Sequence, residues 1–351
     1  MRDFLKHTFA TLLGIFIFLG LSVGGLIFLV IATASKDTGP RVKDKSVLVF
    51  DLSQNITDSR PSSSARDIVS EALSGDETDT ITLRTVLDTI DHATQDPKII
   101  ALYLHGSSGK SASGFATLKE VRKALTRFKA TGKKIYAYDV DWREREYYLA
   151  SVANTIAVNP IGQLEINGLS SESMFYAGAL QKFGVGVQVT RVGKYKSAVE
   201  PFLLTKRSPA NKEQTEKLLG DLWGEFLTTT SKDRKMTVQQ LQKIADSQGI
   251  LNPEESRKNG LTDKVAYSDE ISAELKTLTG EDEENKSFRQ VTLKTYAKIA
   301  EDNPKKGNAK QKVAVIYADG EIVNGQGTAG QVGGDRLARQ LRDLRLNDDV
   351  K

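Results

Sequence analysis

The sequence predicts an α/β fold built around a parallel sheet, preceded by one transmembrane helix and followed by the start of a second, similar unit. Three observations carry this prediction. Short apolar runs of strand length alternate with segments of helical spacing along residues 47–278, an order that is typical of parallel βαβ units. Residues 9–31 carry no charge. The pattern that opens at residue 47 returns at residue 313.

The composition indicates a folded protein and excludes several classes of site. Of the 351 residues, 39% are hydrophobic and 27% are charged, which is ordinary for a chain with a substantial core. There is no cysteine, so disulfides, thiolate metal sites and cysteine nucleophiles are excluded. With only three histidines, we expect no multi-histidine metal site and no cofactor. Acidic and basic residues are interleaved and the net charge is +4, so we expect no nucleic-acid partner.

The amino-terminal region predicts a retained membrane anchor. Residues 1–8 form a short tail, and residues 9–31 form a charge-free apolar run that would measure roughly 35 Å as a helix, enough to cross a bilayer. A cleaved signal peptide is the alternative, because residues 32–34 (Ala-Thr-Ala) resemble a small-residue cleavage site. The run is longer than the apolar core of a signal peptide, which favours the anchor. Charges flank both ends and leave the orientation open, and a polar linker follows at residues 32–46.

Strands and helices are then predicted in alternation. The strands fall at residues 47–52, 99–104, 134–138, 155–158 and 187–192, and the helices at residues 83–93, 115–129, 146–152 and 171–183. The run at 99–104 is continuously apolar, as in a strand buried on both faces of a parallel sheet. Val86, Ile90 and Ala93 share one side of the first helix. Residues 211–278 are mostly helical, which gives a first domain at 47–278, and the polar stretch 279–312 is predicted as a linker with one embedded strand.

The last part of the chain repeats the opening of the first domain, which indicates a duplicated unit. Residues 313–317 match the character of residues 47–52, and a polar turn follows each run. Leu337, Leu341 and Leu344 repeat the spacing of the apolar side of the first helix. The chain ends where the second copy of the next strand should begin. We therefore expect residues 313–351 to be the start of a truncated second domain, and the chain to be a fragment of a longer protein.

One candidate site is the loop at residues 105–113, because a loop after a buried parallel strand is the usual place for a site in an α/β sheet. Its glycines free backbone N–H groups for an oxyanion hole, and Ser107, Ser108 or Ser111 could attack a carbonyl. His105 could then act as the base. Nothing in the spacing separates a nucleophile from a polar turn, and the polar turn is the favoured interpretation.

A second candidate is the basic segment 191–202, RVGKYKSAVEPF, in which Lys194 and Lys196 follow a predicted strand and a glycine. A lysine acts as a general base only when it is neutral, and burial and nearby positive charge both favour the neutral amine. Arg191 and Lys194 could supply that charge. Taken alone, a basic loop after a strand is usually solvated surface.

The segment GKYKSAVEPF resembles the lysine motif of the signal peptide peptidase A (protease IV) family, which are membrane-bound serine proteases with a serine–lysine dyad. Further segments resemble segments of that family in the same order: residues 143–151, 154–162, 255–265 and 332–351. The resemblance covers nearly the whole chain, and the predicted anchor is at the expected end.

The resemblance implies two tandem domains related to the Clp protease and crotonase folds, with the lysine in the first and the serine in the second. Carried onto this sequence, the general base is Lys196, and the nucleophilic serine lies beyond Lys351. The resemblance further implies cleavage of apolar peptides such as cleaved signal peptides, contact with membrane lipid and a homo-oligomer. It places the bulk of the chain on the non-cytoplasmic side of a bacterial-type inner membrane or a thylakoid.

Two other interpretations stay open. Because no recognised nucleophile is present, these residues could serve as a non-catalytic, membrane-anchored scaffold or assembly subunit. A crotonase-like acyl-CoA enzyme is the other, and both the anchor and the lysine motif speak against it. The sequence that follows Lys351 would discriminate among the three.

Overall fold

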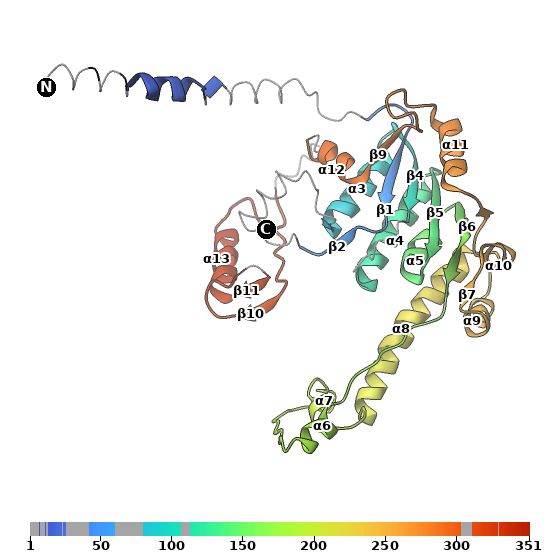
Figure 1. Cartoon of the computed structure of the whole chain (residues 1–351), viewed down its shortest axis with the longest axis vertical. Coiled ribbons are helices and arrows are strands. Elements are labelled where there is room, and N and C mark those ends of the chain that lie inside the picture. Colours follow the sequence, from blue (N-terminus) through green and yellow to red (C-terminus); the bar gives the residue numbers. More distant parts are fainter. Residues whose placement is uncertain are drawn as a thin grey trace. The chain divides into compact units, whose positions relative to one another are not determined.

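The computed structural model of this chain describes residues 42–59, 80–106, 113–302, 311–328 and 330–351. Near the amino terminus it also describes His7, Thr11, residues 13–22 and residues 24–25. The chain divides into two compact units, Met1–Val42 and Lys43–Lys351 (Figure 1). The sheet and the candidate site both belong to the second unit.

The first unit is helical at the described residues between 7 and 25. Its apolar side chains there, among them Phe16, Phe18 and Leu21, are exposed. None of the helices in the described ranges is long and apolar enough to cross a membrane. Several residues of the predicted span 9–31 lie outside the described residues, so the anchor stays a prediction.

The described part of the second unit is built on a mostly parallel sheet of seven strands. These are β1 (Ser46–Asp51), β4 (Ile99–His105), β5 (Lys134–Trp142), β6 (Thr155–Glu165), β7 (Ile250–Leu251), β8 (Lys264–Val265) and β9 (Gln290–Thr292). Their order is β7-β6-β5-β4-β1-β9, with β8 also paired to β6 (Figure 1). Among these described strands, every pair of neighbours is parallel except β6 and β7. The predicted α/β class with a parallel sheet is confirmed.

The crossover helices lie together on one face of the sheet. They are α3 (Leu83–Gln95), α4 (Phe115–Ala130) and α5 (Glu144–Ala150), and they link strands that follow one another across the sheet. Right-handed crossovers that progress in one direction place their helices on the same face. Thr82 begins α3, because its hydroxyl accepts the backbone N–H of Thr85 at 3.1 Å. The apolar side of α3 predicted from the sequence is fully buried.

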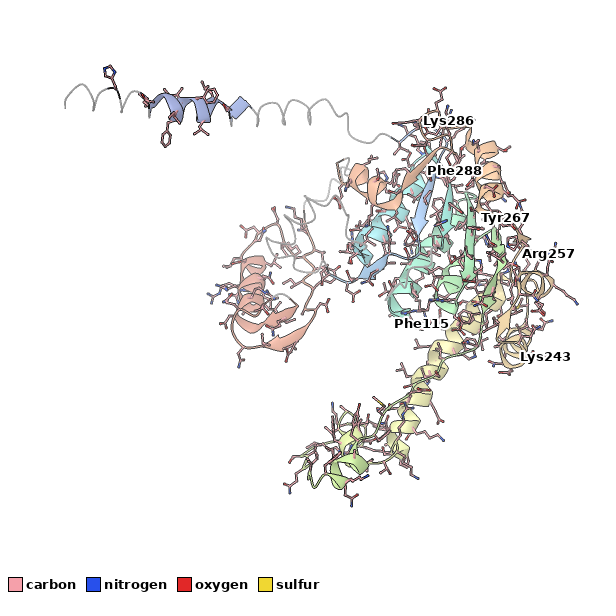
Figure 2. All side chains as sticks on the ribbon, viewed as in Figure 1. Phe115, Lys243, Arg257, Tyr267, Lys286 and Phe288 are labelled. Atoms are coloured by element: carbon pink, nitrogen blue, oxygen red, sulfur yellow. The ribbon has the colours of Figure 1, made fainter. Side chains whose placement is uncertain are left out.

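The other face of the sheet packs on α11 (Ser268–Thr279). Val47, Ala101 and Tyr138 from three strands form one buried cluster with Ile271 and Leu275 of this helix. Phe288, labelled in Figure 2, belongs to the same cluster. Because side chains alternate between the two faces of a strand, the core has two layers with the sheet between them.

The segment expected as a linker is partly integrated into the sheet. Strand β9 pairs with β1, and α12 (Leu293–Asp302) packs against α3. The hydroxyl of Tyr296, which is fully buried, donates to Asp96 at 2.7 Å and lies 2.8 Å from Nδ1 of His92. The one strand expected within this stretch is β9, whereas helix α12 was not expected from the polar composition, and residues up to 302 belong with the sheet.

Two predicted elements between β6 and α8 (Pro209–Asp233) are corrected. The helix expected over residues 171–183 is reduced to α6 (Ala177–Lys182). Residues 187–192, expected as a strand, have no regular secondary structure. Their valine alternation is typical of a strand, but a strand also needs a neighbour for its backbone groups. Val189 and Val192 are exposed instead.

Beyond residue 311, the chain repeats the topology of its beginning. Strands β2 (Asn55–Thr57) and β3 (Thr80–Thr82) form a parallel pair that leads directly into α3, and β10 (Glu321–Val323) and β11 (Gln331–Gly333) form a parallel pair that leads directly into α13 (Gly334–Arg345). The difference in residue number between β3 and β11 is the same as that between α3 and α13, whereas β2 and β10 differ by another number of residues.

The same two differences in residue number also relate one backbone pairing in the first copy of the repeat to one in the second copy. Ser46 is paired with Ile99 in parallel register, and Lys312 forms a parallel bridge with Val350. The strand predicted at residues 313–317 is absent from this described stretch, where Val313 and Val315 are exposed. In the first copy of the repeat, the corresponding strand, β1, is held between β4 and β9. The chain ends at Lys351, just after the residue that corresponds to the start of β4.

Candidate active site

The candidate lysine lies on an excursion that leaves the sheet after β6. This excursion contains α6, α7 (Glu200–Leu203) and the first turns of α8, and Figure 1 shows α6 and α7 beside the end of α8 that is farther from the sheet. The opposite end of α8 is anchored in the core through Phe226 and Leu227. Where the chain leaves β6, the carboxylate of Glu144 accepts the backbone N–H groups of Asn167 and Gly168, both at 2.7 Å. We call residues 168–208 the arm.

Lys196 is carried by a tight turn on the arm. Gly193 has φ +104, which a residue with a side chain rarely adopts. The guanidinium of Arg191 donates to the backbone carbonyl of Lys196 at 2.8 Å. The next residue, Ser197, accepts a hydrogen bond from the side-chain amide of Gln214 on α8 at 2.7 Å. The turn is therefore held at the carbonyl of Lys196 and at the side chain of the next residue.

Glu200 anchors this turn to the beginning of α8. Its side chain is 1% exposed. Ser208, the N-cap residue of α8, donates to the carboxylate through its hydroxyl at 2.6 Å and its backbone N–H at 3.2 Å. Asn211 donates at 2.9 Å, and Arg191 lies 3.6 Å away. Hydrogen bonds, first from Ser208 and then from Asn211, lower the pKa of Glu200 to about 2.

Lys194 is held in a different way from Lys196. Its ammonium donates to the hydroxyl of Tyr195 at 3.2 Å and pairs with Glu213 at 3.3 Å, and these contacts raise the pKa of Lys194. Lys196 is exposed, and no described side chain bonds to its ammonium. The two cations expected to supply like charge, Arg191 and Lys194, are each paired with a carboxylate, so their positive charge is largely compensated.

The loop after β4 offers no competing nucleophile among the residues described. Ser107, Ser108 and Ser111 lie outside the described residues. Ser113 is buried, and its hydroxyl accepts the backbone N–H of Ile56 at 2.9 Å, which is a structural contact. His105 stacks on Tyr138 with ring centroids 6.3 Å apart, and burial lowers its pKa. The sheet side of this loop is thus packed.

A buried carboxylate lies beneath the start of that loop. Asp139 is 4% exposed, and a Cβ at Gly106 would collide with its carboxyl group. Burial raises the pKa of Asp139 to about 7. Glu146 also has a pKa raised by burial. Despite these carboxylates, the described residues contain no group of three or more acidic or histidine side chains suited to a metal ion.

Sequence reasoning singled out the lysines and missed the groups that hold them. Glu200, Ser208 and Gln214 are ordinary polar residues in the sequence, and their contacts join positions up to 17 residues apart. One signal was present in the sequence. Ser208 followed by Pro209 is a typical helix start, with an N-cap residue before proline in the first turn. It would have placed the beginning of α8 close to the lysine motif.

Comparison with known proteins matches the middle of the chain to a family model. The model of peptidase family S49 matches residues 127–281, which include Lys196 and Glu200. A solved structure of the 1510-N membrane-bound stomatin-specific protease, a mutant in complex with a substrate peptide, is similar over 71% of this chain and 91% of that chain, at 11% identity and a TM-score of 0.35.

Curated relatives match most of this chain. Protease 4 of Salmonella typhi is 32% identical over 88% of the chain and 50% of its own length. Protease 4 of Haemophilus influenzae is 28% identical over 93% and 55%, and the chloroplastic serine protease SPPA of Arabidopsis thaliana is 27% identical over 86% and 42%. The chain thus spans about half the length of these relatives. Residues 127–281 thus carry a peptidase family S49 domain, and these similarities together support a member of the signal peptide peptidase (protease IV) family of serine peptidases.

Proposed function

We propose that the intact protein is a membrane-anchored endopeptidase with a serine–lysine dyad, in which Lys196 is the general base and the serine lies beyond Lys351. One observation carries the proposal: Arg191 holds the Lys196 turn through the Lys196 carbonyl and Gln214 holds it through the Ser197 side chain, while the Lys196 side chain is exposed. A fixed backbone under an exposed ammonium is suited to a lysine that meets its partner on another part of the protein.

In the proposed reaction, the serine hydroxyl oxygen attacks the carbonyl carbon of a peptide bond, and neutral Lys196 accepts the hydroxyl proton. The tetrahedral intermediate collapses, the carbon–nitrogen bond breaks, and the Lys196 ammonium returns a proton to the leaving amine. Water then attacks the acyl-enzyme, with Lys196 accepting its proton and returning one to the serine oxygen. Because only a neutral lysine can begin this sequence, the part of the protein that carries the serine must also shield Lys196 from water.

The repeated topology supports a second domain as the source of that serine. Strands β10 and β11 and helix α13 repeat the order and register of β2, β3 and α3. We therefore expect the residues after Lys351 to form a buried strand beside residues 313–317, followed by a Ser/Gly-rich loop. Within the α/β class, we thus propose two tandem domains of the Clp protease and crotonase type.

The membrane, the substrates and the assembly belong to the same proposal. The charge-free run 9–31 supports a single-pass anchor in contact with lipid, with the bulk of the chain on the non-cytoplasmic side of a bacterial-type inner membrane or a thylakoid. Apolar peptides such as cleaved signal peptides are the proposed substrates. Exposed apolar side chains on the arm, among them Phe183, Val192 and Phe202, support a homo-oligomer.

A comparison of two proteins tests the proposal. The purified 351-residue chain should hydrolyse no signal-peptide-like substrate, because it carries the base without a matched nucleophile, whereas the longer parent protein should. Both are assayed by mass spectrometry of the peptide products. Robust cleavage by the 351-residue chain would refute the division of the dyad and return attention to Ser107, Ser108 and Ser111. An inactive parent protein would favour the non-catalytic scaffold instead.

A further inference from the structure

We infer that Glu200 and Arg191 form a positioning pair, which fixes the Lys196 turn against the beginning of α8 so that the lysine meets its partner in one orientation. The inference rests on the proposed role of Lys196 as the base. Neither residue touches the reacting atoms in this scheme. Both act through the backbone on which Lys196 is mounted.

Arg191 links the Glu200 carboxylate to the Lys196 turn. Its guanidinium donates to the carbonyl of Lys196 at 2.8 Å and lies 3.6 Å from the Glu200 carboxylate. A guanidinium presents several N–H donors in a fixed plane, so it can hold both groups at once. The path from α8 to the lysine is therefore short: Ser208 and Asn211 hold Glu200, Glu200 attracts Arg191, and Arg191 holds the carbonyl of Lys196.

Capping of α8 does not explain why the Glu200 carboxylate is buried. Ser208 already caps α8, because its hydroxyl accepts the backbone N–H of Asn211 at 3.1 Å. A buried carboxylate loses its hydration and persists only when hydrogen bonds and an opposite charge compensate that loss. On an arm whose other side chains are largely exposed, a buried charge directed at Arg191 orients the guanidinium that holds the Lys196 carbonyl.

Glu213 supplies a matched control on the same helix. It contacts the same motif, but it pairs with Lys194 and accepts from Tyr195 at 3.0 Å. Its side chain is 60% exposed, and nothing among its contacts leads to Lys196. An exposed pair of this kind contributes little. The same Glu-to-Gln change at the two positions therefore separates the Lys196 path from a general effect of charge on the motif.

The test uses the full-length parent protein and measures kcat and KM separately. Glu200→Gln keeps the shape of the side chain, and its amide can still accept from Asn211 and donate to the hydroxyl of Ser208. It removes the charge that attracts Arg191. We expect kcat to fall by about 10- to 100-fold with KM nearly unchanged, the scale of a small misplacement of a catalytic group. Glu213→Gln should stay within about 2-fold of the wild type.

Arg191→Gln should reproduce the loss of kcat, and it keeps the test decisive if Glu200→Gln fails to fold. Because both residues act along one path, the double variant should be no slower than the slower single variant. A kcat within about 2-fold of the wild type for folded Glu200→Gln would overturn the inference. So would a rise in KM that matches a fall in melting temperature, since that is the signature of a structural role. If Lys196→Ala itself stays active, the proposed function fails, and the positioning of Lys196 falls with it.

Discussion

The sheet region and the arm of this protein differ in how they hold their charged and polar side chains. In the sheet, polar groups are buried and held by the fold: Asp139 lies under Gly106, and Tyr296 is hydrogen-bonded to Asp96. On the arm, the backbone is held by buried Glu200, whereas the side chain of Lys196 stays exposed. The difference is consistent with the proposal that the arm carries Lys196 as the general base, while the sheet provides stability. Changes in one region should therefore leave the property of the other intact.

The largest expected effect is on the arm. In the parent protein, Lys196→Ala should lower kcat by about 10²- to 10⁴-fold, the scale of general-base catalysis. Lys196→Arg should be no better, because a guanidinium stays protonated at working pH. Lys194→Ala should keep most of the activity, since Lys194 is engaged with Glu213. Rates against pH for the three variants, with circular dichroism as the check on folding, measure this. An active Lys196→Ala beside a dead Lys194→Ala would reverse the assignment.

The next effect is on the sheet and depends on pH. The pKa of Asp139 is raised from 3.8 to about 7, so between about pH 4 and pH 7 the unfolded chain has lost a proton that the folded chain retains. Stability therefore falls as pH rises through this window. Asp139→Asn removes the penalty, and it should raise the free energy of unfolding at pH 8 by up to about 4 kcal/mol.

Urea unfolding of Asp139→Asn and the wild type at pH 4 and pH 8 checks the sign. The two should have similar stability at pH 4, where Asp139 is protonated in the folded chain. His105 has a lowered pKa and acts in the opposite direction, but it is present in both proteins and cancels in the comparison. An advantage that is equal at the two pH values would show that the carboxyl does not titrate as described.

The smallest effect tests whether α12 belongs to the sheet. Tyr296→Phe removes the hydroxyl that donates to Asp96 and contacts His92, and it should lower the free energy of unfolding by about 1–3 kcal/mol, since a partly buried hydrogen bond to a charged carboxylate is lost. Tyr317→Phe is the control, because Tyr317 is 51% exposed and should change stability by less than about 0.5 kcal/mol. Chemical unfolding measures both. Equal stabilities would mean that α12 contributes little to the sheet region.

Much of the sheet could be predicted because its signals are local. The apolar run of β4 and the apolar side of α3 were assigned from neighbouring residues, and both are buried as expected. The carboxyl-terminal ends of two strands were predicted too early. Strands β5 and β6 extend to Trp142 and Glu165, beyond the predicted ends, because a register irregularity between Asp139 and Asp141 lets them pair again further on. Such pairing depends on the neighbouring strand, which the sequence of one strand does not contain.

The sequence by itself determined the α/β class, the succession of strands and helices around β1, β4 and β5, and the family through the lysine motif. It did so because apolar periodicity and a long motif are readable within short segments. Tertiary structure decided the rest. Residues 187–192 have the composition of a strand and do not form one, because no described strand lies beside them. The strand expected within the polar stretch 279–312 does form, as β9, because β1 supplies its partner. The role of Glu200 likewise depends on Ser208, Asn211 and Arg191 converging on one carboxylate, and that convergence exists only once the arm is folded.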